Sequence, residues 1–290
     1  MTKFQSYLLL FAIAAAPTFV AGKYIFENVS TTGKIYKPPC LNEADLWNGG
    51  ISCPVAVHTA AAADKTFNIL FIGNSFTFMN DLGGMLAKVA SSDPTNKIQM
   101  NIQSVTLSGA HLMGTYKDPE ALKVLHTRHW DFVVLQEHSA WTFTQESVEE
   151  TFDALNSWNW EIRKIPATPV FFENWSDEIG SGQYTDTHYH LYGQNPDQVQ
   201  KEFSRETYTL AKSYDMPVVP VGDFWNYVNK KPRAPELYNV DKHHPSPAGT
   251  YLTALLFYRY FTSHAPDHVA FWPPEITPEQ AQMLIAAIPR

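Results

Sequence analysis

The chain has 290 residues, of which 44% are hydrophobic and 17% are charged, and this is enough to build one large globular domain with a full core. The formal net charge of −8 argues against nucleic acid as a partner, because no basic excess is available to neutralise phosphates. This charge favours small neutral or cationic substrates, or sugars.

The first 22 residues have the pattern of an export signal. Lys3 supplies the positive start, residues 7–16 form an apolar core, and Val20-Ala21-Gly22 resembles a cleavage site. The apolar core is too short to span a bilayer comfortably, although an uncleaved membrane anchor is the alternative. We therefore expect a secreted or periplasmic protein, without stable membrane insertion after the signal is removed.

Residues 23–65 lack a sustained period and contain Pro-Pro and Gly-Gly pairs, so we expect an N-terminal extension that ends in a linker. The chain's only two cysteines, Cys40 and Cys53, lie in this extension. In an exported protein, two cysteines at this spacing predict a disulfide rather than a metal pair. Two unpaired thiols are the alternative if the export prediction is wrong. The main domain is expected over residues 66–290.

The apolar run 69–72 is rich in strand formers and ends at a Gly-Asn pair, which predicts a strand buried on both faces of a parallel sheet. Asn80 and Asp81 can cap a helix that follows over residues 82–89. Ser75 would then lie between the strand end and the helix start, where open α/β sheets place their chemistry. This serine is the candidate nucleophile, although many such turns only connect elements or bind an anion.

Strands and helices alternate along the rest of the domain, which predicts an α/β fold: a three-layer α/β/α sandwich on a parallel, flavodoxin-like sheet of five strands. The loop 106–114 after the second strand presents Gly109, whose backbone can approach a ligand closely, unless it is an ordinary turn. The further strands are expected at 98–105, 131–135, 169–172 and 217–221, and helices at 119–127, 145–164, 197–213, 247–262 and 277–288.

The fourth strand opens into a long irregular stretch, residues 173–196, which we expect to form one wall of a substrate cleft. Aromatic faces stack on sugar rings, so the stretch favours carbohydrate over a purely aliphatic acyl chain. The candidate substrate contacts are Trp175, Tyr184, His188 and Tyr189.

Histidines of the same stretch raise the question of a metal site. His188 and His190 could join His243 as ligands, but no Cys or acidic ligand at helical spacing accompanies them. We therefore expect solvated loop histidines, no metal and no other cofactor.

Near the far end of the domain the sequence contains Asp241, His244 and Pro245, with two residues between the Asp and the His. Together with Gly73-Asn74-Ser75, this pattern resembles the SGNH (GDSL-type) hydrolase family, whose first block is Gly-Asp-Ser or Gly-Asn-Ser and whose last is Asp-x-x-His-Pro. The family's oxyanion-donating glycine is matched by Gly109. The resemblance covers roughly residues 66–262.

A third block of the family, Gly-x-Asn-Asp, is not matched. The strand 131–135 runs instead into Gln136-Glu137-His138-Ser139, which looks like a branch of the family in which Gln-Glu follows that strand. The Gln136 amide is one methylene longer than the family's Asn but still offers N–H donors. Glu137 is the alternative occupant of the pocket, although an ionised carboxylate would repel an oxyanion.

The resemblance implies a serine hydrolase in which Ser75 attacks, His244 is the base and Asp241 holds the base. The oxyanion would meet the N–H groups of Ser75 and Gly109 and the side chain of Gln136. His243 is expected to be a neighbour that faces elsewhere.

The function expected from these features is a secreted esterase that removes small acyl groups, most plausibly acetyl, from a polysaccharide through an acyl-enzyme. Two alternatives stay open at this point. One is a lipid esterase or thioesterase, and the other is a non-catalytic carbohydrate-binding protein with the same fold.

Overall fold

A computed structural model describes residues 28–29, 35–36, 65–139, 145–181 and 195–290. The expected export signal, Cys40, Cys53 and three of the candidate substrate contacts, Tyr184, His188 and Tyr189, lie outside these residues. Within them, no helix is long and apolar enough to cross a membrane.

The domain is built on a sheet of five parallel strands in the order β4-β3-β5-β6-β7, which confirms the predicted sheet. The first strand of the domain, β3, is central and pairs with β4 on one side and β5 on the other. Far from it in sequence, β1 (Asn28–Val29) and β2 (Ile35–Tyr36) form a separate antiparallel pair. The five strands are β3 (Lys65–Gly73), β4 (Ile98–Thr106), β5 (Phe132–Gln136), β6 (Thr168–Phe172) and β7 (Val218–Val219).

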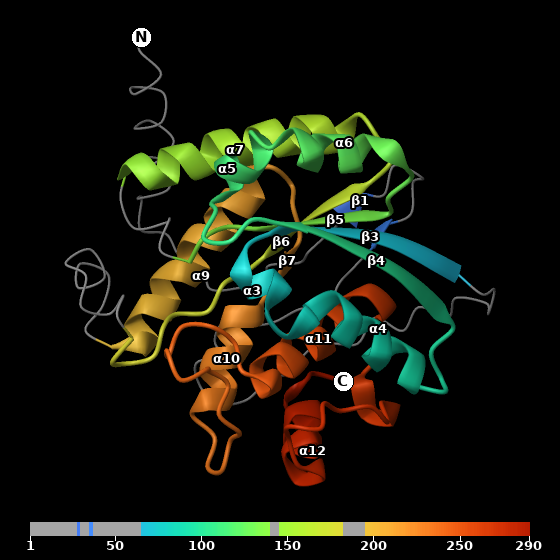
Figure 1. Ribbon diagram of the computed structural model, residues 1–290, viewed down its shortest axis with the longest axis vertical. Coiled ribbons are helices and arrows are strands. Elements are labelled where there is room, and N and C mark those ends of the chain that lie inside the picture. The colour runs from blue at the N-terminus through green and yellow to red at the C-terminus, as the bar shows by residue number, and fades with distance from the viewer. Residues whose placement is uncertain (1–27, 30–34, 37–64, 140–144, 182–194) are drawn as a thin grey trace.

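Helices cover both faces of this sheet, as a three-layer sandwich requires (Figure 1). Short helices follow the strands at the carboxyl edge, and longer ones form the outer layers. The helices are α3 (Ser75–Phe78), α4 (Leu82–Ser92), α5 (Leu112–Tyr116), α6 (Pro119–Thr127), α7 (Gln145–Arg163), α9 (Pro196–Ser213), α10 (Val221–Asn229), α11 (Pro247–Thr262) and α12 (Pro278–Ala287), with 3-10 turns η1 (Met79–Asp81) and η3 (Pro266–His268).

Side-chain alternation along the strands divides the interior into two cores. Ile69 and Phe71 of β3 face a core shared with α4, α10, α11 and α12, whereas Leu70 and Ile72 face a core shared with α5, α6, α7 and α9. A strand that is apolar on both faces is expected only when helices cover both sides of the sheet. The apolar run 69–72 therefore indicates a sheet that is covered by helices on both faces.

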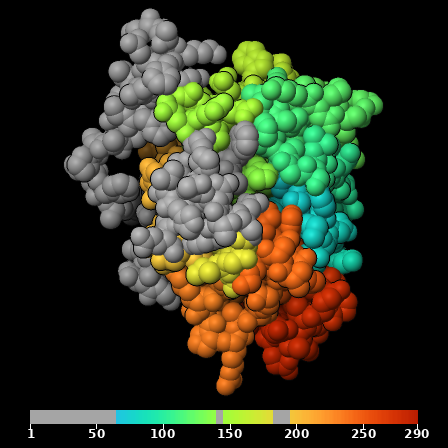
Figure 2. Space-filling model, turned by 60° about the vertical axis from the view of Figure 1, so that its left-hand side comes forward, coloured from blue at the N-terminus to red at the C-terminus, as the bar shows by residue number. Residues whose placement is uncertain are grey.

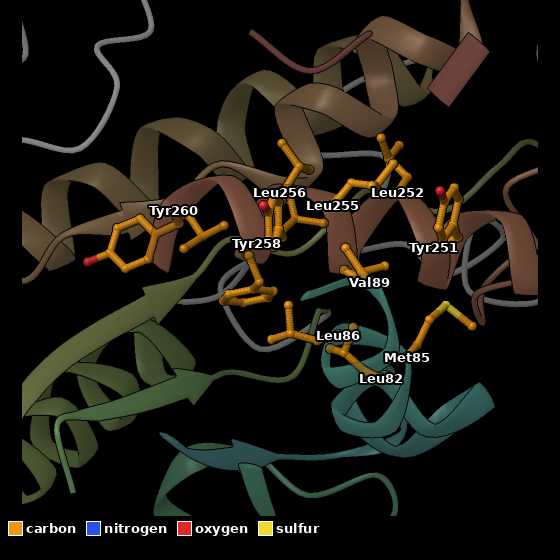
Figure 3. Packing of buried hydrophobic residues seen from close by; sticks show 14 of the residues in the cluster. Leu82, Met85, Leu86, Val89, Tyr251, Leu252, Leu255, Leu256, Tyr258 and Tyr260 are labelled. Atoms are coloured by element: carbon orange, nitrogen blue, oxygen red, sulfur yellow. The ribbon is translucent and has the colours of Figure 1, made fainter. Parts of the chain in front are cut away.

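Helix α11 lies deepest in the first of these cores, and every residue from Ala248 to Thr262 is buried. A helix that is apolar all round must pack on several sides. In Figure 3, Leu86 and Val89 of α4 point toward α11, whereas Leu252 and Leu256 of α11 point to its other side. The buried Tyr258 hydroxyl also donates to Asp93 Oδ2 at 2.6 Å, just beyond the end of α4. The docking of α11 on α4 brings the segment before α11 to the carboxyl edge of the sheet.

Two sequence predictions need correction at element ends. The strand expected at 217–221 is only two residues long, because Pro220 precedes the first turn of α10, which begins at Val221. Of the two residues expected to cap the helix after Ser75, only Asp81 does so, by accepting the Gly84 N–H at 3.0 Å. Asn80 instead donates its side-chain amide to the Pro245 carbonyl at 2.9 Å and so ties η1 to the start of α11.

Candidate active site

The candidate nucleophile lies where β3 gives way to α3. Asn74 caps α3 by accepting the Phe76 N–H at 3.1 Å on its side chain, and Ser75 is the first residue of the helix. The turn is tight, because a Cβ on Gly73 would lie 2.5 Å from Gln136 Oε1 and 2.6 Å from Thr77 Oγ1. Glycine at position 73 therefore lets the strand end pass directly under the neighbouring side chains.

The structure brings Ser75, His244 and Asp241 into one hydrogen-bonded row. His244 Nε2 lies 2.9 Å from Ser75 Oγ, and His244 Nδ1 lies 2.6 Å from Asp241 Oδ2. Asp241 Oδ1 also accepts the backbone N–H groups of His243 and His244 at 3.1 and 3.0 Å. Partial burial raises the pKa of Asp241, but the hydrogen bonds from His244 and from these N–H groups outweigh burial, so that the pKa lies below its ordinary value.

The turn that carries this pair is a short loop closed by backbone bonds. Asn239 N–H donates to the His244 carbonyl at 2.7 Å, and Lys242 takes the left-handed conformation with a φ of 59°. Ser246 then caps α11 by accepting the Gly249 N–H at 3.2 Å. Asp241 and His244 are thereby placed on one side of a turn that leads straight into a buried helix.

His243 has a partner of its own. Its Nδ1 lies 2.7 Å from Oδ1 of Asp177, whose side chain is fully buried and also accepts the Ser181 hydroxyl at 2.9 Å. The His243 ring packs 4.9 Å from the Phe76 ring and 4.5 Å from the His244 ring, measured between centroids. The sequence did not single out Asp177, because the carboxylate that pairs with His243 is 66 positions away from it.

Trp175 was expected to contact substrate, and the structure contradicts this. Its indole is only 1% exposed and is stacked between the rings of Phe76, at 4.1 Å, and Trp225, at 3.9 Å. Its Nε1 donates to the His243 carbonyl at 3.0 Å. Trp175 is therefore a core side chain that supports the site from inside.

Gly109 lies on the exposed loop after β4 with a φ of 65°, a left-handed conformation that favours glycine, and a Cβ there would meet nothing within 4 Å. The loop is fastened beside the nucleophile, since Asn74 Nδ2 donates to the Ala110 carbonyl at 3.0 Å and Leu107 N–H to the Gly73 carbonyl at 3.1 Å. Across the described part of the chain, no hydrogen bond uses the N–H of Ser75 or Gly109. Both groups are thus unoccupied donors.

The sequence led us to expect the Gln136 side chain as a third N–H donor beside Ser75 and Gly109, and the structure does not place a free donor there. Its Oε1 accepts from the Asn74 N–H at 2.9 Å and from Thr77 Oγ1 at 3.0 Å. Its Nε2 donates to the Glu137 carbonyl and, at 3.3 Å, to Asn174 Oδ1. Because both amide hydrogens point at protein oxygens and the residue is 1% exposed, Gln136 fixes the strand ends to one another.

The two residues after Gln136 have strongly displaced pKa values. Burial raises the pKa of Glu137 to about 7, against the hydrogen bonds that it accepts. Burial also lowers the pKa of His138 to about 4, helped by the neighbouring His243 and His111. His138 is therefore a neutral imidazole at physiological pH, close to the candidate active site.

In Figure 2 the cyan atoms around α3 meet orange atoms from the C-terminal part of the domain, and the yellow atoms lie on the other side of these orange atoms. Among the residues that the structure describes, no group of three or more His, Cys, Asp or Glu side chains could hold a metal ion. The other proposed histidine ligands, His188 and His190, lie outside those residues.

Comparison with known proteins shows a similarity of fold to several solved structures. No family model matches the sequence, and no curated protein matches it. Among solved structures, a DUF4886 family protein from Bacteroides uniformis matches with a TM-score of 0.62 and 16% identity over 77% of this chain and 93% of that one. An acetylxylan esterase from Geobacillus stearothermophilus matches with a TM-score of 0.48 and 17% identity over 69% and 96% of the two chains.

A protein from Slackia heliotrinireducens that is provisionally assigned to the SGNH hydrolases matches with a TM-score of 0.54 and 24% identity, over 68% of this chain and 100% of that chain. The similarity extends over the whole of that protein. The chain described here therefore has an SGNH-like α/β fold.

Proposed function

We propose that this protein is a serine esterase in which Ser75 is the nucleophile, His244 the general base and acid, and Asp241 the group that orients His244. The observation that carries the proposal is the hydrogen-bonded row itself, with 2.9 Å between Ser75 Oγ and His244 Nε2 and 2.6 Å between His244 Nδ1 and Asp241 Oδ2. A serine hydroxyl becomes an effective nucleophile when a positioned base can remove its proton. The depressed pKa of Asp241 keeps the orienting carboxylate ionised.

The reaction would proceed in two halves. His244 takes the proton of Ser75 as Oγ attacks the ester carbonyl, and then gives it to the leaving alkoxide, which leaves an acyl group on Ser75. Water, activated by the same imidazole, releases the carboxylic acid. The negative oxygen formed in each half would be met by the N–H groups of Ser75 and Gly109, each of which typically contributes about 3 kcal/mol of barrier lowering.

The substrate class that we propose is a small acyl ester, acetyl foremost, on a polysaccharide. The net charge of −8 disfavours acidic substrates, and the segment after Ser181 is rich in aromatic and histidine side chains of the kind that stack on or hydrogen-bond to sugars. We propose Tyr184, His188 and Tyr189 of that segment as substrate contacts. The export signal and a Cys40–Cys53 disulfide belong to the same proposal, since acylated polysaccharides lie outside the cell membrane.

The first test is hydrolysis of p-nitrophenyl acetate by the wild type and by Ser75→Ala. The wild type should release p-nitrophenol, and a serine-directed phosphonate should give a single adduct on Ser75 by peptide mass spectrometry. Full activity in Ser75→Ala would exclude the esterase proposal. A wild type that hydrolyses no ester but binds acetylated glycan would favour the carbohydrate-binding alternative.

A second test defines the substrate. Comparison of acetyl with octanoyl esters separates a small-acyl esterase from a lipid esterase or thioesterase, because only the latter should prefer the longer chain. Acetate release from a panel of acetylated glycans then identifies the polymer. For the compartment, intact mass should show a mature chain starting near Lys23 that gains about two hydrogens on reduction.

A further inference from the structure

Two consecutive side chains at the carboxyl end of β5 face opposite parts of the candidate site. Gln136 accepts from the turn that carries Ser75, as described above. Glu137 accepts from the other side: its Oε1 receives the N–H groups of Leu112 at 2.9 Å and of His138 at 2.7 Å. Its Oε2 receives the Thr151 hydroxyl of α7 at 3.1 Å. The residue is 2% exposed, so these contacts are made away from bulk water.

Leu112 is the residue at which the Gly109 loop becomes helix α5. Helix N-termini leave their first N–H groups without an intrahelical partner, and His111 at the cap position makes no side-chain bond to them. The Glu137 carboxyl fills that role for Leu112 from a neighbouring strand. Leu112 is otherwise locked in place, since it is fully buried and its carbonyl accepts from Trp158 Nε1 at 3.2 Å.

The loop that presents Gly109 is thus fixed at both ends. Before Gly109, the Leu107 N–H donates to the Gly73 carbonyl, and directly after Gly109 the Ala110 carbonyl accepts from the side chain of Asn74. Where the loop becomes α5, the fastening is the bond from the Leu112 N–H to Glu137, three residues after Gly109. A donor contributes to catalysis in proportion to how well it is held before the charge develops.

We infer that Glu137 is the positioning residue for the Gly109 loop, which it holds by accepting the Leu112 N–H, so that Gln136 and Glu137 together fix the two N–H donors of the oxyanion hole without contacting the substrate. This inference rests on the proposed esterase function. It also gives a physical reason for two consecutive long acceptor side chains at the end of β5: the Gln136 oxygen accepts from the turn that carries Ser75, and the Glu137 oxygen accepts from the loop that presents Gly109.

The feature that matters for this role is an acceptor oxygen, and not a charge. Burial raises the pKa of Glu137 to about 7, so both protonation states are present at neutral pH, and the carbonyl oxygen of a protonated carboxyl still accepts N–H bonds. A glutamine at this position would keep that oxygen and could donate its amide to Thr151. Methionine would keep the length of the side chain and remove the acceptor.

The experiment compares Glu137→Met with Glu137→Gln, with p-nitrophenyl acetate as the probe. We expect Glu137→Met to lower kcat by on the order of tenfold to a hundredfold with KM within about threefold, as loss of transition-state stabilisation requires. Glu137→Gln should keep kcat within about threefold. Hydrogen exchange read by mass spectrometry should be faster in peptides covering 107–113 in the Met variant only, whereas peptides covering 75–78 should be unchanged.

Wild-type kcat and wild-type exchange in a folded Glu137→Met would overturn the inference. If the Met variant does not fold, Glu137→Gln decides the question, because a folded Gln variant with a large loss of kcat would show that an acceptor oxygen is not sufficient. A failure of the proposed function looks different: the wild type would hydrolyse no ester and Ser75 would take no phosphonate, while the exchange comparison would still test the hold on the loop.

Discussion

The two halves of the candidate site are supported in different ways. Ser75 lies at the end of the central strand, and the residues around it are almost fully enclosed, with Asn74 2% and Gln136 1% exposed. The turn that carries Asp241 and His244 lies at the surface, where the Asp241 side chain is 45% exposed and Val240 is 96% exposed. The candidate nucleophile is thus built into the end of the central strand, whereas the imidazole and the carboxylate that orients it lie on a surface turn.

The outer half is held by the segment that follows β6. Trp175 Nε1 donates to the His243 carbonyl at 3.0 Å, the Asp177 carboxylate pairs with the His243 ring at 2.7 Å, and the Glu178 N–H donates to the Lys242 carbonyl at 3.0 Å. These contacts join residues more than 60 positions apart. The inner half therefore depends on strand register and the outer half on tertiary docking, so mutations in the two halves should have different effects on stability and activity.

The largest expected effect is a loss of activity that is the same for a variant in either half. Ser75→Ala and His244→Ala should each lower kcat/KM for p-nitrophenyl acetate by at least about a thousandfold, because the two groups act as one unit in the same proton transfer. Thermal melts followed by circular dichroism should show both variants folded. An active His244→Ala beside an inactive His243→Ala would mean that the other imidazole is the base.

The inner half should be sensitive to loss of Gln136. Gln136→Ala removes two donors and two acceptor contacts from a buried position, so the free energy of unfolding should fall by about 3 kcal/mol in urea titrations. A donor used only in the transition state would leave that free energy unchanged while lowering kcat. The matched control is Gln99→Ala on the exposed side of β4, which should stay within about 0.5 kcal/mol of the wild type.

A buried carboxyl gives the inner half a pH dependence. The folded-state pKa of Glu137, about 7, exceeds its ordinary value of 4.5, so folding favours the protonated form and stability falls as pH rises from 4.5 through 7. His138 acts in the opposite sense, because its pKa of about 4 lies below 6.5 and its contribution is lost as pH falls through that window.

The Glu137 contribution is isolated by subtraction. The unfolding free energy of Glu137→Gln minus that of the wild type should rise by up to about 3 kcal/mol between pH 4.5 and pH 7.5, since the His138 contribution cancels. Chemical unfolding at a series of pH values measures the difference. A difference that does not change with pH would place the folded-state pKa of Glu137 near its ordinary value.

The smallest effect belongs to the outer half. His243→Ala takes a partner from the buried Asp177, so the unfolding free energy should fall by about 2 kcal/mol, and kcat by no more than about tenfold, because His244 keeps its bonds to Ser75 and Asp241. His243→Gln, which retains an N–H donor, should recover part of the loss. Val240→Ala on the same turn should change neither quantity, and a thousandfold loss of kcat in His243→Ala would show that the outer half is as finely fixed as the inner.

Sequence patterns predicted the features that depend on local order. The two-faced apolar run 69–72 predicted the central strand, and the spacing of Asp241 and His244 predicted a pair that the structure places side by side. The role of Trp175 could not be predicted, because an aromatic ring in a loop gives no sign of whether another ring covers it. The orientation of the Gln136 side chain could not be predicted either, since its partners Asn74, Thr77 and Asn174 come from the segments that follow β3 and β6. Most of the extension 23–65 and the segment 182–194 lie outside the described residues, so a linker, a disulfide and substrate contacts there stay predictions.

The distance along the chain between the two halves has a consequence for folding. Ser75 and His244 are separated by 169 positions, and the imidazole reaches the serine only when α11 is docked on α4. Contacts of such long sequence separation carry a large loop-closure cost and form late in most folding mechanisms. During refolding, the reactivity of Ser75 toward a phosphonate should therefore return after the far-ultraviolet circular dichroism of the helices. The rate at which this reactivity returns would then measure the last step of folding, the docking of α11 on α4.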